Sequence, residues 1–253
     1  MENNITITFL ANTAILIQFG EVKFLIDGIY DKNGHIFSNL TTNQWQDLKM
    51  GNGIFSNIDY LLFTHEHGDH FSPERTMQYI SYQKPKAVFM PKNGSKSLET
   101  LKKMLEQMKI PCALLDEKNA KRTKFFLEKD IFVEAFQTRH LDKAYQNVTH
   151  FCFLLSFCDK KLLITADVDF TTEYFYQINE IALEAIFVNP LFYHSKQGQK
   201  ILQRLNSKIN VVYHIPFEED DKMRMRKWLQ RDLEKQTDKR VIALLERGKQ
   251  FIL

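Results

Sequence analysis

The sequence lacks any hydrophobic run long enough to cross a membrane. Its longest uncharged apolar stretch, Phe151 to Cys158, is far short of the roughly 20 residues that a bilayer requires. The first four residues, Met-Glu-Asn-Asn, have no basic region and no small-residue cleavage site, so we expect no signal peptide. Three cysteines (Cys112, Cys152 and Cys158) without metal-type spacing fit a reducing compartment, and the last two occupy equivalent strand positions, as small core residues do. These features predict a soluble, cytoplasmic protein.

An excess of charge of one sign is also lacking. There are 34 basic and 31 acidic residues, without the concentrated basic stripe that usually marks a nucleic-acid surface. The densest basic run, residues 222–227, follows four acidic residues at 218–221, which is typical of a solvent-facing helix. Phosphate-binding loops, dinucleotide fingerprints and Gly-x-Ser-x-Gly elbows are absent from the sequence. A nucleic-acid partner and a serine nucleophile are therefore not expected.

What the chain does have is a globular composition: 253 residues, of which 44% are hydrophobic and 26% charged. Because no repeat, low-complexity tract or linker marks a boundary, we expect one domain spanning residues 1–253. Strands separated by helices, in two halves that each begin with successive strands, predict an α/β fold. In this fold, two mixed β-sheets pack face to face with helices outside.

Three local features are predicted from turn signals. A tight turn at Asp159-Lys160 should join two strands, and the segments 241–245 and 251–253 should form a closing hairpin. Residues 28–57 are polar and rich in Asn and Gly, which indicates a long loop of the kind that often covers a binding site.

The segment His65-Glu-His-Gly-Asp-His70 places three imidazoles and one carboxylate within six residues. It directly follows an apolar strand at 58–63, and Ser72 and Pro73 are typical of the start of a helix. Imidazole and carboxylate groups suit zinc, and also iron or manganese. So short a turn cannot offer four ligands to one ion with good geometry, so we expect two ions to share them.

Two adjacent cations need further ligands, including a carboxylate between them. Later strands have candidates at their ends: His140, Asp167 and His214. With these residues, the histidine motif resembles that of the metallo-β-lactamase superfamily of metallohydrolases, and the resemblance covers nearly the whole chain. It implies a four-layer αβ/βα sandwich with two divalent metal ions, most often zinc and in some members iron or manganese.

Carried over position by position, the resemblance also implies a ligand for each place. The first ion would be held by His65, His67 and His140. The second would be held by Asp69, His70 and His214, and Asp167 would bridge the two. Asp27 matches an aspartate that in the family braces the histidine loop, and such carboxylates fix the tautomer of ligating imidazoles.

For two of the proposed ligands, another residue nearby in the sequence is also a candidate. Relatives often carry the bridging aspartate in Gly-Asp-Thr, whereas here Asp167 lies in Ala-Asp-Val and is followed by Asp169, a second candidate for the bridge. His150 competes with His140 as a ligand, and is otherwise a candidate substrate contact. His194 is a further candidate substrate contact.

The implied activity is that of a compact lactonase-like or phosphodiesterase-like hydrolase. A hydroxide that bridges the two ions would attack an ester, lactone or phosphodiester of a small substrate, and Asp69 or a nearby histidine would donate the proton. We therefore expect a small-molecule substrate and no nucleic-acid or membrane partner; the sequence predicts no oligomeric state.

Three other functions stay open on this resemblance. A non-catalytic metal-binding or sensing protein would be expected to have lost ligands, whereas all seven are present. An RNA-processing nuclease would need an inserted domain or arm, for which 253 residues leave little room. Iron-dependent redox chemistry with a single ion would not require the full second ligand set.

Overall fold

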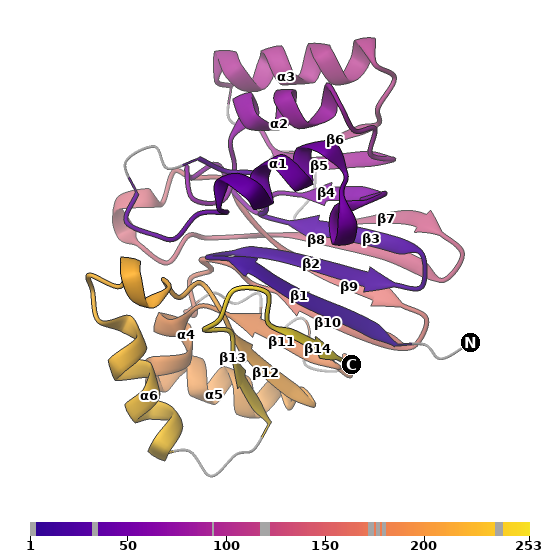
Figure 1. The fold of residues 1–253 in the computed structure, drawn as a ribbon. Helices are drawn as coiled ribbons and strands as arrows, with labels where there is room; N and C mark the ends of the chain where they lie inside the picture. Colours follow the sequence, from indigo (N-terminus) through magenta and orange to yellow (C-terminus); the bar gives the residue numbers. More distant parts are fainter. Residues whose placement is uncertain are drawn as a thin grey trace. The chain divides into compact units, whose positions relative to one another are not determined.

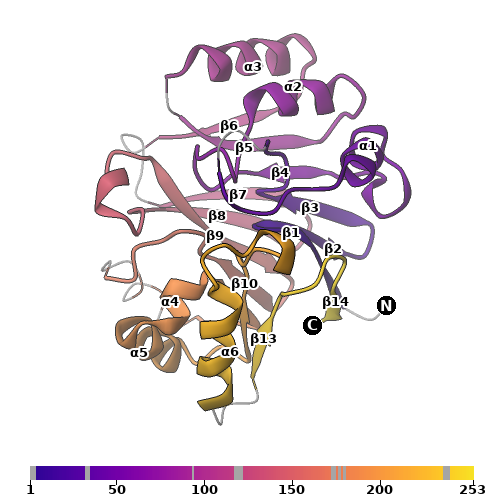
Figure 2. The ribbon, with the colours of Figure 1, turned by 60° about the vertical axis from the view of Figure 1, so that its left-hand side comes forward.

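The computed structural model describes residues 4–31, 35–92, 94–116, 122–171, 175, 178, 181–235 and 240–253. The chain divides into two compact units, the first comprising Met1–Asp116 and Glu246–Leu253 and the second Glu117–Leu245. Each unit is built on one seven-stranded mixed sheet (Figures 1 and 2). Among the described helices, none combines the length and the apolar character that a membrane crossing demands.

The sheet of the first unit has the strand order β14-β1-β2-β3-β4-β5-β6. Its strands are β1 (Ile5–Ala11), β2 (Ala14–Phe19), β3 (Val22–Ile26), β4 (Tyr60–Leu62), β5 (Ala87–Pro91), β6 (Cys112–Leu115) and β14 (Gln250–Ile252). Pairing is antiparallel from β14 to β3 and parallel from β3 to β6. Because Ile26 of β3 pairs with Leu62 of β4, the residues that follow these two parallel strands emerge side by side at one edge of the sheet.

Three helices cover one face of this sheet: α1 (Thr42–Met50), α2 (Pro73–Ile80) and α3 (Lys96–Gln107) (Figure 1). Each begins at a hydroxyl side chain that accepts a backbone hydrogen bond, the usual N-cap arrangement. Their buried faces contribute Leu48, Tyr79 and Leu101 to a core that also contains Leu61 of β4 and Val88 of β5. This apolar contact holds the histidine loop, which lies between β4 and α2, at both of its ends.

The sheet of the second unit has the order β13-β12-β11-β10-β9-β8-β7. Its strands are β7 (Arg122–Glu128), β8 (Ile131–Thr138), β9 (His150–Phe157), β10 (Lys160–Ile164), β11 (Ala185–Val188), β12 (Ile209–Val212) and β13 (Val241–Ala243). Pairing is antiparallel from β7 to β10 and parallel from β10 to β13. The carboxyl ends of β10, β11 and β12 therefore meet at one edge, where ligand-binding residues of open α/β sheets commonly lie.

The helices of the second unit are α4 (Pro190–His194), α5 (Lys196–Leu205) and α6 (Met225–Lys235), with short 3-10 turns η2 (Lys143–Tyr145) and η4 (Glu218–Asp220). Phe192 of α4, Leu202 of α5 and Leu229 of α6 pack with Leu163 and Ile186 of the sheet. Two mixed sheets with associated helices confirm the α/β class predicted from the sequence. Strands β6 and β7 were not predicted.

The predicted C-terminal hairpin is wrong. Strand β13 pairs parallel with β12 in the sheet of the second unit, whereas β14 pairs antiparallel with β1 in the sheet of the first. The turn between β13 and β14 contains Gly248 at φ +75°, but it passes from one sheet to the other rather than closing a ribbon. Local turn signals do not reveal which distant strand accepts each partner.

Two further local predictions need correction. The turn between β9 and β10 is centred on Cys158 and Asp159, because Lys160 already pairs with Phe157 and Cys158 adopts a left-handed φ of +54°. Cys158 is consequently exposed and is not a core residue, whereas Cys152 is buried. The segment 28–57 is not a continuous loop, since it contains α1 and the 3-10 turn η1 (Gly53–Phe55).

Replacing Gly198 by alanine is expected to destabilise the second unit. A Cβ atom at this buried position of α5 would overlap the carbonyl oxygen of Phe192 in α4, so backbone rather than a flexible side chain would have to move. Such overpacking costs about 1–3 kcal/mol. Thermal unfolding should show a midpoint lowered by about 2–10 °C. Lys200→Ala, at an exposed position of the same helix, is the control, and equal melting of the two variants would contradict the close approach.

Candidate functional site

The first cluster of potential ligands lies in the loop between β4 and α2. The amides of His70 and Phe71 both donate to the carbonyl oxygen of His67, at 2.9 Å each, which folds the loop back on itself. His65 and His70 are fully buried, Asp69 is 7% exposed and His67 is half-buried. The end of β4 and the capped start of α2 thus hold the short turn that contains these four ligand-type side chains.

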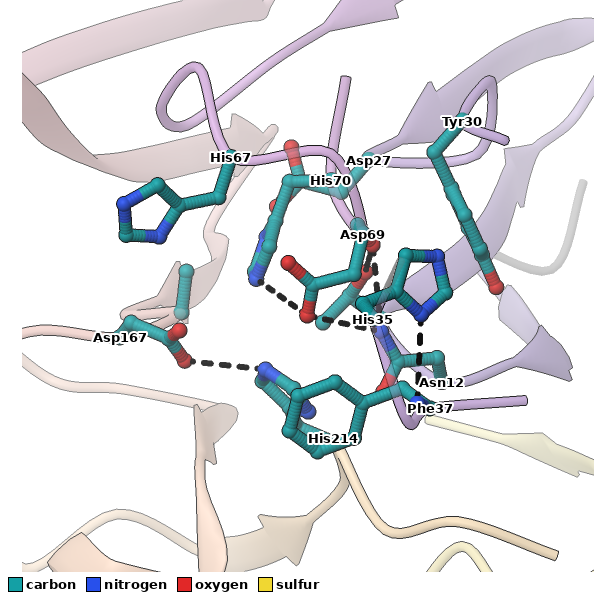
Figure 3. Close-up of polar contacts among 12 residues, drawn as sticks. Asn12, Asp27, Tyr30, His35, Phe37, His67, Asp69, His70, Asp167 and His214 are labelled. Atoms are coloured by element: carbon teal, nitrogen blue, oxygen red, sulfur yellow. Dashed lines mark hydrogen bonds and ion pairs between the residues drawn. The ribbon is translucent and has the colours of Figure 1, made fainter. Parts of the chain in front are cut away.

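The spacing of these side chains fits bound metal. His65 Nε2 lies 3.1 Å from His67 Nδ1. His70 Nε2 lies 3.7 Å from Asp69 Oδ2 (Figure 3). Two tetrahedral ligands with bonds near 2.1 Å are roughly 3.4 Å apart. Each pair therefore has the separation of two atoms that share one ion.

Asp27 braces this loop from the end of β3. Its Oδ1 accepts from the amide of Thr64 at 2.8 Å, while its Oδ2 accepts from the Thr64 hydroxyl at 2.6 Å and lies 2.9 Å from His70 Nδ1. The carboxylate is fully buried. When His70 Nδ1 carries the proton toward Asp27, its Nε2 is left with a lone pair on the side of Asp69.

Residues near the N-terminus hold Asp69 from the other side. Asn12 Nδ2 donates to the main-chain oxygen of Asp69 at 3.1 Å and to its Oδ2 at 3.4 Å (Figure 3). The Thr13 hydroxyl donates to the same main-chain oxygen at 3.1 Å. The Tyr30 hydroxyl donates to the carbonyl oxygens of Ala11 and Ser38. Burial raises the pKa of Tyr30 well above its ordinary value, with a smaller contribution from the Asp69 carboxylate, so Tyr30 remains a donor.

The second cluster is centred on Asp167, just after β10. Asp167 Oδ1 lies 3.2 Å from His214 Nε2 and Oδ2 lies 3.5 Å from His140 Nε2 (Figure 3 shows the His214 contact). The two oxygens thus face different imidazoles, which is the arrangement of a carboxylate that bridges two ions. The spacings again match ligands of a shared ion, roughly 3.4 Å.

Strand ends position this second cluster. The amide of Leu141 donates to the Asp167 carbonyl at 2.8 Å, and His140 forms a β-bridge with Val168. Tyr213 accepts at its hydroxyl from the amide of Ala166, immediately before Asp167. The side chains of His140, Asp167 and His214 are thereby placed where strands end. Clusters of His and Asp residues in this chain thus fit a divalent metal site.

The competing residues have local partners of their own. Asp169 accepts from the amide and hydroxyl of Thr171 at 2.8 Å, so its carboxylate is engaged in a turn. His150 is fully buried, its Nδ1 lies 2.6 Å from the Thr138 hydroxyl, and its ring centre is 6.0 Å from that of His140. Because Asp167 Oδ2 lies 3.5 Å from His140 Nε2, His140 remains the preferred candidate over His150 for a ligand beside Asp167.

His194, the other candidate substrate contact, lies in α4 rather than in a loop. Its Nδ1 is 2.5 Å from Asp232 Oδ2 on α6, and its ring packs edge-on against Trp228. The side chain is 57% exposed. Its role as a substrate contact stays a prediction.

Two of the cysteines, Cys112 and Cys152, are not activated. Burial raises the pKa of Cys152 to about 12, partly offset by its hydrogen bond with Thr138, and burial also raises the pKa of Cys112 to about 12. These thiols are protonated at neutral pH. A cysteine nucleophile at either position is therefore disfavoured, in agreement with the sequence.

Sequence reasoning missed several residues that support the clusters. They are Asn12, Thr13, Thr64 and Thr138, all of which place a side-chain donor or acceptor against a ligand-type residue or its neighbour. The position of Thr64, next to His65, was visible in the sequence. The other contacts join residues distant in sequence, for example 57 positions between Asn12 and Asp69, and no local pattern marks them.

The two mixed sheets and their helices form the fold of a solved metallo hydrolase and of a solved tRNase Z, described below. The model of the family described as Anti-Pycsar protein Apyc1 matches residues 5–251, and the chain belongs to this family. No curated protein matches the sequence significantly.

Three solved structures illustrate the shared fold. The metallo hydrolase Igni18 from Ignicoccus hospitalis is 12% identical, with a TM-score of 0.60 over 99% of this chain and 98% of that one. The short form of human tRNase Z is 13% identical, with a TM-score of 0.57 over 99% and 98%. CmlA, a diiron β-hydroxylase from Streptomyces venezuelae, is 14% identical, with a TM-score of 0.62 over 100% of this chain. This chain spans about half of CmlA, 55% of its length, and 54% in a CmlA mutant.

Proposed function

We propose that this protein is a metal-dependent hydrolase that opens the phosphodiester of a cyclic nucleotide. The description of its family, an anti-Pycsar protein, suggests a role in degrading cyclic nucleotides. Two solved relatives of the same fold, a tRNase Z and a diphosphatase of the PhnP family, are named for cleaving phosphate-containing substrates. The observation that carries the proposal is Asp167, whose two oxygens face the imidazoles of His140 and His214 as a bridging carboxylate would.

We further propose that the two clusters act together in one domain, as the family model spans both. The first ion would be held by His65, His67 and His140, the second by Asp69, His70 and His214, with Asp167 shared. Zinc is the proposed ion because imidazole and carboxylate ligands at these spacings suit it. Manganese or iron would use the same donors.

Bound divalent ions would supply Lewis acidity and a water of lowered pKa. The side chains of the protein would orient the ligands, balance charge and transfer the proton. Asp27 holds the proton of His70 at Nδ1, and Asp167 balances the positive charge between the imidazoles. Asp69 would take up the proton that the attacking water loses as its oxygen bonds to phosphorus. It would then pass this proton to the ribose oxygen that departs when its own bond to phosphorus breaks. Oδ1 is the proposed oxygen for this transfer, because Oδ2 accepts from Asn12.

A substrate panel tests this function. The protein should be loaded with Zn²⁺ or Mn²⁺, its metal content per chain measured, and its turnover compared on cyclic mononucleotides, a linear dinucleotide, a lactone and RNA. We expect two ions per chain and turnover of at least one cyclic mononucleotide about 100-fold or more above that of RNA, because a site for a small cyclic diester need not accept a strand. Chelation should abolish the activity and added metal should restore it.

The panel also separates the alternatives. Two bound ions without turnover of any substrate would indicate a metal-binding protein, and preferential cleavage of RNA, weakened by salt, would indicate a nuclease. Preferential lactone cleavage would support the proposed hydrolase activity but contradict a cyclic nucleotide as the substrate.

A further inference from the structure

The tip of the β1–β2 hairpin is buried, which is unusual for a polar turn. Asn12 and Thr13 connect the paired residues Ala11 and Ala14, and both are fully buried. Hairpin turns normally lie at the surface because their polar groups need water or other partners. Burying two polar side chains here is costly unless they are hydrogen-bonded.

The partners of both side chains are on Asp69. The Thr13 hydroxyl donates to the main-chain oxygen of Asp69 at 3.1 Å. Asn12 donates to that oxygen and also to the carboxylate, at Oδ2, the oxygen that lies 3.7 Å from His70 Nε2. The turn thus holds the backbone of Asp69 twice and its side chain once.

We propose that Asn12 is a positioning residue, which keeps Asp69 Oδ2 turned toward His70 Nε2 so that both can bind the same metal ion. The proposal rests on the proposed function, in which Asp69 and His70 are ligands. Asn12 acts through Asp69 and needs no contact with the ion. A hydrogen-bond donor on one oxygen of a carboxylate favours one rotation of that carboxylate about its last bond.

The backbone at this position explains why the residue is asparagine. Asn12 has a φ of +45°, in the left-handed region that asparagine, aspartate and glycine occupy more readily than other residues. Among these three, asparagine alone has a side-chain N–H donor. Aspartate would place a second carboxylate against Asp69 Oδ2, and glycine would leave the oxygen without this donor.

Two substitutions and one control test the proposal without straining the turn. Asn12→Gly keeps the backbone conformation and removes the donor, and Asn12→Asp keeps the size and replaces the donor with a carboxylate. Thr13→Val is the control, because it removes a bond to the main-chain oxygen only. The measurements are Zn²⁺ affinity by competition with a chelator, the thermal midpoint, and kcat and KM on the best substrate of the panel.

We expect Asn12→Gly to lower the Zn²⁺ affinity of one of the two sites about 10–100-fold, the usual effect of removing a partner of a ligand. Asn12→Asp should bind at least as weakly as the glycine variant. Thr13→Val should stay within about 3-fold of the unmodified protein, and kcat should fall with Asn12→Gly while KM changes little.

A role in stability alone would give other results. If Thr13→Val and Asn12→Gly lower the affinity equally, or if Asn12→Gly retains the affinity within 3-fold, the positioning role is overturned. Failure of the proposed function is distinguishable: an unmodified protein that binds Zn²⁺ but hydrolyses nothing contradicts the hydrolase, and the affinity comparison still decides the role of Asn12. An unmodified protein that binds no Zn²⁺ contradicts both.

Discussion

Replacing Asp167 by alanine is expected to lower kcat/KM about 1,000-fold and to reduce bound metal below two ions per chain. Its oxygens lie 3.2 Å from His214 Nε2 and 3.5 Å from His140 Nε2, so one substitution removes the shared partner of both imidazoles. Metal ions contribute several kcal/mol of transition-state stabilisation, and each 1.36 kcal/mol corresponds to about tenfold in rate. Steady-state kinetics and elemental analysis of the same preparation measure the two effects.

The matched control is Asp169→Asn. Asp169 lies two residues further on, accepts from the amide and hydroxyl of Thr171, and would keep the amide bond through the remaining side-chain oxygen. We expect this variant to retain its metal and to stay within about 3-fold of the normal kcat/KM, as surface turns tolerate such a change. Loss of metal in Asp169→Asn together with full activity in Asp167→Ala would assign the bridge to Asp169 instead.

The parts of the fold that could be predicted from the sequence depend on short-range signals. The apolar strands, the N-cap at Ser72 and the histidine motif all carry their information within a few residues, and the structure places them as expected. Strand ends were also informative, because His140, Asp167 and His214 each lie two or three residues beyond the end of a strand. Helix α1 was missed although its capping box, with Thr41 and Gln44, is a readable start signal.

The wrong predictions concern features that depend on residues distant in the sequence. The turn at Cys158 was misplaced by one residue because the pairing of Lys160 with Phe157 depends on the whole ribbon, and a shift of one residue reverses the faces of a strand. The partner of β14 is β1, at the opposite end of the chain, and no local signal indicates it. Asn12 belongs to the same class: its turn could be predicted, but its hydrogen bonds to Asp69 could not.

Replacing Asp27 by alanine is expected to destabilise the protein by about 3–5 kcal/mol, the usual cost of removing one partner of a buried charged group. The fully buried carboxylate accepts from the amide and hydroxyl of Thr64 and contacts His70 Nδ1. Its φ of +44° adds strain, because alanine tolerates the left-handed region poorly. Unfolding by urea measures the loss in free energy directly.

Asp27→Asn separates the metal-related role from stability. Asparagine tolerates the same backbone conformation and keeps one acceptor, so the expected loss is about 1–3 kcal/mol, but Zn²⁺ affinity should still fall about 10–100-fold because His70 loses the carboxylate that fixes its tautomer. The control is Asp59→Asn, which alters another carboxylate, 13% exposed, that accepts from the amide of Lys23 and pairs with Lys86. It should lower stability and leave Zn²⁺ affinity unchanged. Equal loss of Zn²⁺ affinity in both asparagine variants would mean that affinity follows overall stability, and that Asp27 does not act through His70.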